Sequence, residues 1–312
     1  MHSYATTHDT AAGLISLTRR TLLSRAGMFG LGALAGTGLG AGVMAAIAFR
    51  PDAITRARLA ALPAEGRPTG IVFGESIARL IDGGAIDPGK FDQLYAARGN
   101  PMPGWMADLL EGKPGRNEIV FDLETAPHLL SLLWPVGLAT RTSFNARSPI
   151  AGENVDNYAS TGGWPLGQAD TGGIYFNSVD TVDLNDAQSE LVLDLAQRIF
   201  RPCCDNSTFF QDCNHGSAVL GLLELGAAQG LDRPRLENAA LAASAFWYPD
   251  QMTEVAIHRE MLENESFADT TPMELLGAAR FSISGWMRNV HEPLARSGLL
   301  PQVSGGQAGC GV

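Results

Sequence analysis

The sequence predicts a mainly α-helical protein, with a bundle-like helical domain, a long irregular segment rich in glycine and aromatic residues, and at most a small β element. Two observations support this prediction. Helical apolar spacing with capping residues recurs through residues 183–312, and only residues 116–125 alternate clearly as a strand does. The chain of 312 residues is 45% hydrophobic and 18% charged, so it can bury a full core.

The first 50 residues form a segment of their own. Arg19 and Arg20 precede residues 26–49, which are rich in glycine and alanine and carry no charge. This pattern resembles the twin-arginine class of bacterial export signal. The resemblance implies export to the periplasm with cleavage after Ala48. If that site is not cut, residues 26–49 would tether the chain to the inner membrane.

Residues 51–312 are expected to form one exported domain, and residues 51–142 its N-terminal part. Apolar spacing and breaker residues divide this part into short elements. The expected elements are a helix at 53–62, a strand or helix at 71–81, a helix at 88–99, a strand at 116–125, and a helix capped by Thr125 that runs to about 134. Pro135 should break or kink the last helix, because proline has no N–H to donate.

The next part, residues 143–182, is expected to be irregular. It is rich in glycine, asparagine, serine and aspartate, and a loop region of this length inside a domain is often functional. It could be a lid or pocket wall, or a purely structural excursion. Exposing its aromatic side chains would be costly, so we expect them to be buried against the helices. They are Phe144, Tyr158, Trp164, Tyr175 and Phe176.

The C-terminal part, residues 183–312, is expected to be helical. Helices are predicted at 183–200 with Asp183 as cap, and at 217–230, 234–248, 251–265 and 272–289. The last one has the strongest start, because Thr271 and Glu274 form a capping box and Pro272 occupies the first helical position.

Residues 201–216 join two of these helices and hold three of the four cysteines and one histidine. Thiolate and imidazole groups are ligands for zinc, copper or an iron–sulfur cluster. Neighbouring side chains usually diverge, so only one of two adjacent cysteines is expected to join a site unless the backbone is distorted. The candidate metal ligands are Cys203, Cys204, Cys213 and His215, with Cys310 of the C-terminal tail as a further sulfur.

Two other interpretations of these residues are open. An exported protein meets an oxidising compartment, where an even cysteine count favours disulfides. The chain would then be a non-enzymatic binding or scaffold protein that makes its contacts through residues 143–180. Alternatively, Cys213 precedes a helix N-terminus, which lowers a thiol pKa, and His215 is close. The chain would then be a thiol-dependent enzyme.

Charge and motifs narrow the class of function. The net charge is −11, with Lys90 and Lys113 as the only lysines, so the chain lacks the basic surface of a nucleic-acid-binding protein. His128, His258 and His291 stand apart from any ligand motif and are interpreted as structural. The sequence favours an exported metal-binding protein that handles metal or transfers electrons, with a membrane-bound complex as candidate partner. It leaves open whether the protein is an enzyme and what its substrate is.

Overall fold

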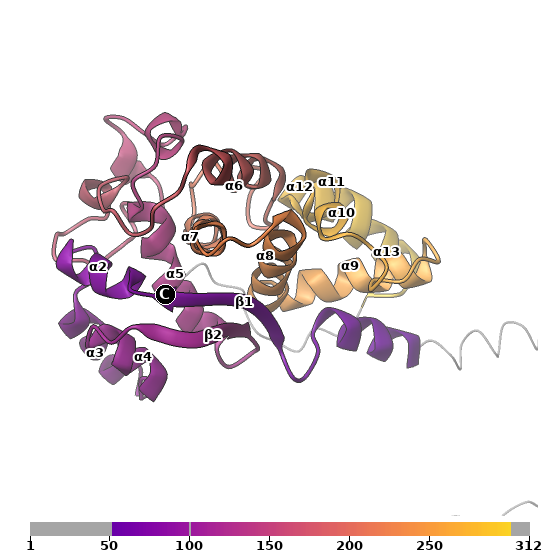
Figure 1. The fold of residues 1–312 in the computed structure, drawn as a ribbon. Helices are drawn as coiled ribbons and strands as arrows, with labels where there is room; N and C mark the ends of the chain where they lie inside the picture. The colour runs from indigo at the N-terminus through magenta and orange to yellow at the C-terminus, as the bar shows by residue number, and fades with distance from the viewer. Residues whose placement is uncertain (1–51, 100, 301–312) are drawn as a thin grey trace, which may run out of the picture. The chain divides into compact units, whose positions relative to one another are not determined.

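The computed structural model describes residues 52–99 and 101–300 (Figure 1). The predicted fold class is confirmed: these residues are mainly helical, with one two-stranded antiparallel sheet. The export signal and tether predicted within residues 1–50, and the candidate ligand Cys310, lie outside the described residues. Over the described ranges, no helix is both long enough and apolar enough to cross a membrane.

The N-terminal part contains short helices and both strands. In chain order these are a helix at 52–61, β1 (Arg67–Gly74), α2 (Ser76–Asp82), α3 (Pro88–Arg98), α4 (Gly104–Leu110) and β2 (Gly115–Phe121). The stretch that fitted either a strand or a helix contains both. Helix α3 begins with Pro88 and is ended by Gly99 with a φ of +65°, as predicted, and Asp87, which was not predicted, caps it by accepting hydrogen bonds from two N–H groups of the first turn.

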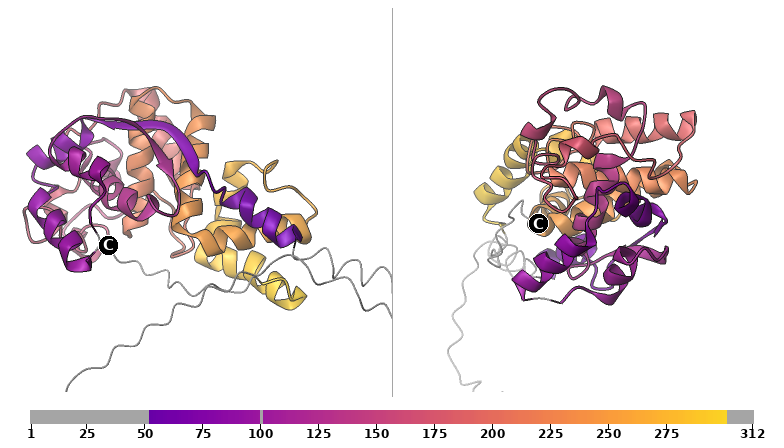
Figure 2. Two further views of the ribbon diagram at one scale, coloured as in Figure 1. Left: turned by 90° about the horizontal axis from the view of Figure 1, so that it is seen from below. Right: turned by 90° about the vertical axis from the view of Figure 1, so that its left-hand side faces the viewer.

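The sheet is small, and its strand β1 runs alongside the helices of the C-terminal part of the chain (Figure 2). β1 and β2 are antiparallel, with Arg67 opposite Phe121 and Gly74 opposite Gly115. A side chain covers the outer edge of β1, because the amide of Gln229 accepts from the N–H of Val72 at 3.0 Å and donates to its carbonyl at 2.8 Å. Gln229 thus occupies the place of a third strand at that position.

Helix α5 (Ala126–Ala139) corrects two details of the sequence prediction. Pro135 lies inside it, yet the helix continues to Ala139, and the Thr125 side chain makes no capping bond. The cause is packing: α5 is buried along nearly its whole length, which offsets the hydrogen bond that proline removes. A Cβ on Gly137 would lie 1.9 Å from the carbonyl oxygen of Ser217, so glycine allows α5 to touch the backbone of a later helix, α7 (Asn214–Ala228).

Residues 143–180 are irregular, as predicted, apart from the short 3₁₀ turns η1 (Asn145–Arg147), η2 (Val155–Asn157) and η3 (Gly173–Tyr175). Of the five aromatic residues expected to be buried, Phe144, Trp164 and Tyr175 are buried, and the other two are half-buried. Trp164 Nε1 donates to the carbonyl of Ala85 at 2.8 Å. Apolar burial and this hydrogen bond hold the segment against the helical body.

The helices α6 (Asp186–Arg198), α7 (Asn214–Ala228), α8 (Arg233–Trp247) and α9 (Pro249–Met261) follow. In Figure 1, α7 is seen nearly end-on with α6 and α8 beside it, and almost all of its residues are buried. The cap of α6 is Asn185, in a capping box with Gln188, and not Asp183 as predicted. Helix α7 begins three residues earlier than predicted, and Cys213 is its N-cap.

The long helix predicted at 272–289 is instead a series of short ones. They are α10 (Pro272–Leu276), α11 (Ala278–Phe281), α12 (Ile283–Trp286), a π-helical turn η4 (Met287–His291) and α13 (Glu292–Ser297). The predicted capping box of Thr271 and Glu274 is present. Gly277 and Ser282 are extended and interrupt the helix, and the Ser282 side chain caps α12 by accepting from the N–H of Gly285.

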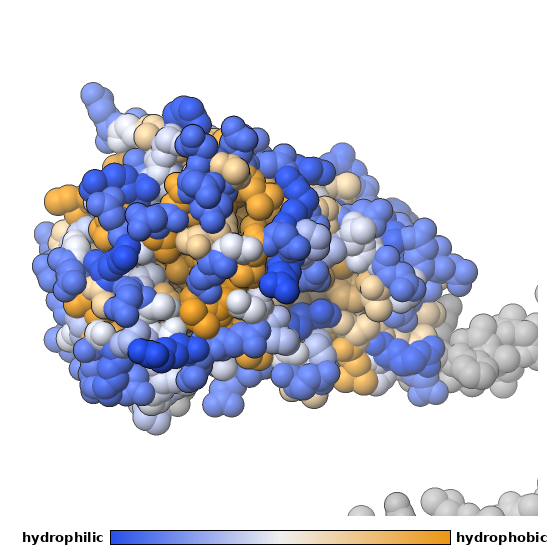
Figure 3. All heavy atoms as spheres, viewed as in Figure 1, coloured by the Kyte–Doolittle hydropathy of each residue, from blue (hydrophilic) through white to orange (hydrophobic). Residues whose placement is uncertain are grey.

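Exposed apolar residues are spread along the chain. The large ones are Leu59, Leu123, Ile174, Leu262 and Met287. On the face shown in Figure 3, apolar residues gather towards the middle and hydrophilic residues surround them. Single exposed apolar side chains are common on folded proteins, so they do not identify a site.

Candidate metal centre

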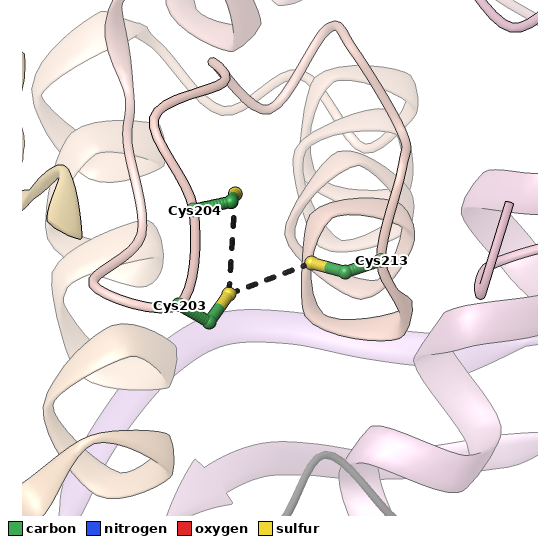
Figure 4. Close-up of side chains that lie close together, drawn as sticks. All are labelled: Cys203, Cys204 and Cys213. Atoms are coloured by element: carbon green, nitrogen blue, oxygen red, sulfur yellow. Dashed lines mark hydrogen bonds between the residues drawn. The ribbon is translucent and has the colours of Figure 1, made fainter.

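Three cysteines meet between the end of α6 and the start of α7. Cys203 and Cys204 lie in the loop that follows α6, and Cys213 is the residue that caps α7. An isolated antiparallel bridge pairs Phe200 with Ser207, which turns the loop back on itself. The Cys203 sulfur consequently points towards the sulfurs of the other two cysteines (Figure 4).

The three sulfur atoms are close enough together to bind one metal ion. Cys203 Sγ lies 4.0 Å from Cys204 Sγ and 3.7 Å from Cys213 Sγ, and all three lie within 4.8 Å of one another. Both members of the adjacent pair take part, because a turn in the backbone at residues 202–203 brings their side chains to the same side. All three cysteines are free thiols in this structure, so no disulfide closes the loop here.

Each sulfur also accepts a hydrogen bond from outside the thiol group. The hydroxyl of Tyr248 donates to Cys203 Sγ at 3.1 Å. Arg201 donates through Nη2 to Cys204 Sγ at 3.2 Å and through Nε to Cys213 Sγ at 3.3 Å. Donors placed around sulfur in this way stabilise negative charge on it, as outer-shell groups do around metal-bound thiolates.

Arg201 is the charged centre of this arrangement. Its side chain is fully buried, and it also donates to Asp212 Oδ1 at 2.9 Å and to Thr208 Oγ1 at 3.4 Å. Burial alone would lower the pKa of Arg201, but the sulfurs of Cys213 and Cys204 raise it above its ordinary value. The guanidinium therefore stays charged.

The start of α7 adds to this electropositive surrounding. Gly216 donates its N–H to Cys213 Sγ at 3.4 Å, so the sulfur takes the place that a serine or aspartate oxygen has at most helix starts. A Cβ on Gly216 would lie 3.0 Å from Cζ of Arg201. Glycine therefore leaves the space that the guanidinium occupies beside the sulfurs.

The three thiols do not share charge equally. The pKa of Cys213 lies well below its usual range, because Cys203 and Cys204 donate hydrogen bonds to its sulfur and Arg201 is adjacent. Hydrogen bonding to Cys204 and Cys213 and burial raise the pKa of Cys203, and the pKa of Cys204 is also raised. These directions favour negative charge on Cys213 over negative charge on the other two sulfurs.

His215, the predicted imidazole ligand, lies beside the cluster and not in it. Its ring packs on Tyr248 and Trp247, with centroid distances of 4.8 and 5.6 Å. Neither ring nitrogen belongs to the set of donor atoms that lie within 4.8 Å of one another, and Nδ1 is buried without a hydrogen-bond partner in the described part of the chain. Burial lowers the pKa of His215 to about 4, so the ring is neutral at pH 7.

The structure thus brings together three of the five predicted ligands, with a fourth adjacent and Cys310 outside the described residues. Sequence reasoning missed Arg201 and Tyr248. Arg201 precedes the cysteine pair by two residues, so an arginine within the cysteine segment was an available signal. Tyr248 follows α8 and carried no such signal, since only the packing of α8 near the loop brings it to the site.

Of the other histidines in the described ranges, His128 and His291 have hydrogen-bond partners, and His258 lies near a carboxylate without a hydrogen bond to its Nδ1. His291 Nδ1 lies 2.9 Å from Glu254 Oε2, and His258 Nδ1 lies 3.7 Å from Glu263 Oε1. His128 Nδ1 is hydrogen-bonded to the hydroxyl of Tyr95. These pairs agree with the structural interpretation of the three residues.

The structure also contains a cavity of about 410 Å³ between β2 and α4. Buried apolar side chains, such as Leu109 and Ile119, contribute to its lining, and charged groups of both signs lie at its edge. Lys113 is already paired with Asp108 at 2.7 Å. This mixed lining does not indicate one class of ligand. The three-thiol cluster is therefore the stronger candidate site.

Comparisons with protein-family models, with curated proteins and with solved structures gave no significant match to this chain.

Proposed function

We propose that Cys203, Cys204 and Cys213 bind one thiophilic metal ion and that the protein functions in metal handling. The observation that supports this is the convergence of three sulfurs from two segments of the chain. Two of the sulfur separations are 3.7 and 4.0 Å and the third is at most 4.8 Å, so a point equidistant from the three sulfurs lies about 2.5 Å or less from each, close to the length of a metal–thiolate bond. The donor set is therefore preformed for a single ion.

A single ion suits this site better than an iron–sulfur cluster. The sulfurs lie 3.7 and 4.0 Å apart, so they converge on one point. Iron–sulfur clusters usually have four cysteine ligands distributed over several iron atoms. Soft thiolate ligands select copper(I) or zinc among single ions.

Metal exchange, more than structural metal binding, fits the exposure of the cluster. All three cysteines are partly exposed, whereas the residues that support them, such as Arg201 and Thr208, are fully buried. An ion could then reach the sulfurs from solvent without unfolding the loop. A structural ion would more often be enclosed by four protein ligands.

The first experiment is elemental analysis of the full chain, purified anaerobically without chelators, with a count of free thiols in denaturant. We expect about one equivalent of zinc or copper and reducible cysteines. The triple variant Cys203→Ser, Cys204→Ser, Cys213→Ser should lose the metal. Cys310→Ser should keep the metal if the C-terminal tail provides no ligand. The metal content of His215→Ala tests whether the adjacent imidazole ring provides one. No metal in the wild type, together with no loading by added zinc or copper(I), would reject the proposal.

We further propose that the protein works in the periplasm, on the basis of the arginine pair and the apolar segment that follows it. A membrane-bound complex is the proposed partner, and a redox-active ion would extend the function to electron transfer. Replacement of Arg19 and Arg20 by lysine should keep the chain in the cytoplasm, measured by cell fractionation against the unaltered chain. Equal export of both forms would exclude this route.

A second candidate function is thiol chemistry at Cys213. It is favoured by the contacts of Cys213 with Arg201 and with the first turn of α7, which together stabilise a thiolate. At pH 6, Cys213 should be alkylated at least about tenfold faster than Cys203 in the metal-free protein, measured by mass spectrometry of peptides after short exposure to iodoacetamide. Equal rates at the two positions would argue against this second function.

A further inference from the structure

We infer that Arg201 sets the charge of the ion that the three-thiol site accepts, and that the site is suited to a monovalent thiophilic cation, copper(I). This inference rests on the proposed metal site and names its cargo. It depends on the position of a permanent positive charge among the three sulfurs. Arg201 is fully buried and donates to the sulfurs of Cys204 and Cys213 at 3.2 and 3.3 Å.

An ion bound by the three sulfurs would lie close to the guanidinium group. The repulsion between the two cations is proportional to the charge of the ion, so it is twice as large for zinc(II) as for copper(I). The side chain is shielded from solvent, which leaves this difference weakly screened. With the same three thiolates, Arg201 therefore disfavours a divalent ion relative to a monovalent one.

The remaining contacts of the sulfurs act in the same direction. Three thiolates with copper(I) keep a net charge of −2, and with zinc(II) a net charge of −1. The hydroxyl of Tyr248, the N–H of Gly216 and the N-terminus of α7 all present positive partial charge to the sulfurs. This surrounding stabilises the more negative centre more strongly.

The number of sulfurs supports the same ion. Zinc in proteins is nearly always bound in a tetrahedron, which needs a fourth ligand. Within the described residues, the group of donors that could hold one ion consists of three cysteine sulfurs. Two of their separations are 3.7 and 4.0 Å, which suits an ion near the plane of the three atoms.

One nearby group opposes this preference. Asp212 carries a negative charge, and its Oδ1 lies 3.8 Å from Cys204 Sγ. Its carboxylate is engaged, however, with Arg201 at 2.9 Å and with Asn206 Nδ2 at 2.8 Å, and it is partly open to solvent. Screening reduces its effect on the ion relative to that of the buried guanidinium.

The test compares the copper(I) and zinc(II) affinities of the full chain, measured anaerobically by competition with colorimetric chelators. The wild type should bind one copper(I) and release zinc(II) to it. In Arg201→Gln the affinity for copper(I) should fall by at least about tenfold more than the affinity for zinc(II). The lost hydrogen bonds to sulfur affect both ions, whereas the lost positive charge removes a repulsion that is larger for zinc(II). Arg201→Lys should restore most of the preference, since it keeps the charge.

Arg259→Gln is the matched control, because Arg259 is also buried but pairs with carboxylates in another part of the fold. Its ratio of copper(I) to zinc(II) affinity should equal that of the wild type. Equal weakening of both ions in Arg201→Gln, or a wild type that keeps zinc(II) against one equivalent of copper(I), would overturn the inference and leave a metal site. If neither ion binds and all thiols stay reactive, the proposed function itself fails.

Discussion

Two buried arginines in this protein have opposite surroundings. Arg259 on α9 is bound by oxygen atoms: Nη1 donates to Glu263 at 2.5 Å, Nη2 donates to Glu265, and Nε donates to Thr270 at 3.0 Å. Arg201 is bound mainly by sulfur, with one carboxylate, that of Asp212. The first is an ordinary ion-pair network, whereas the second has a single carboxylate partner and makes most of its other contacts with sulfur.

The difference shows what makes the cysteine loop chemically distinct. A buried guanidinium needs compensating negative charge, and carboxylates supply it without any reactive group. Around Arg201 a single carboxylate, that of Asp212, is in contact, and the lowered pKa of Cys213 favours a thiolate as a further negative group. The same buried cation therefore favours the ionised form of a cysteine sulfur in the cluster.

The largest expected effect is on stability when these arginines are replaced. Arg201→Gln should lower the free energy of unfolding of the metal-free protein by about 3 kcal/mol, because the cluster and Asp212 lose a buried partner. Arg259→Gln should cost about 1–2 kcal/mol, since Glu265 is 58% exposed and Glu263 keeps Arg280 at 3.0 Å. Urea denaturation under reducing conditions measures both. Equal costs would remove the distinction between the two surroundings.

The next effect concerns His215, the buried neutral ring beside the cluster. Its pKa is lowered by burial to about 4, whereas the unfolded value is near 6.5. Between these values the unfolded chain binds a proton that the folded chain does not, so stability should fall by about 3 kcal/mol as the pH drops from 7 to 4. His215→Phe should lack this contribution. Urea denaturation of both proteins across this range provides the difference, and parallel curves would contradict it.

An effect of opposite sign is expected at Glu224, a buried acid that, unlike the carboxylates near Arg259, pairs with no basic side chain among the described residues. Burial raises its pKa well above the usual value. Above pH 4.5 the unfolded chain loses the proton that the folded chain keeps, so stability should fall by about 1.4 kcal/mol per pH unit. The stability of Glu224→Gln relative to the wild type should therefore rise as the pH increases from 5, until the pH reaches the raised pKa of Glu224 in the folded chain. A constant difference would show that Glu224 is ionised in the fold.

Local signals in the sequence predicted a large part of the fold. Pro88 and Gly99 bound α3, and Thr271 with Glu274 starts α10, because such signals act on backbone groups within one turn of the chain. Predictions failed where distant contacts decided. Pro135 is accommodated by the packing around α5. The helix predicted after Pro272 is interrupted at Gly277 and Ser282, and beyond the second interruption Ile283 and Ser284 donate their N–H groups to residues 204 and 205 of the cysteine loop.

The sequence by itself determined the mainly helical class, the irregular segment and the concentration of cysteines between two helices, since these follow from composition, apolar spacing and residue order. Only the tertiary structure decided which groups meet. It placed Arg201 among the three sulfurs, brought Tyr248 to Cys203 and turned His215 towards aromatic rings. Such contacts depend on the folding of the loop between packed helices, which spacing along the chain does not specify.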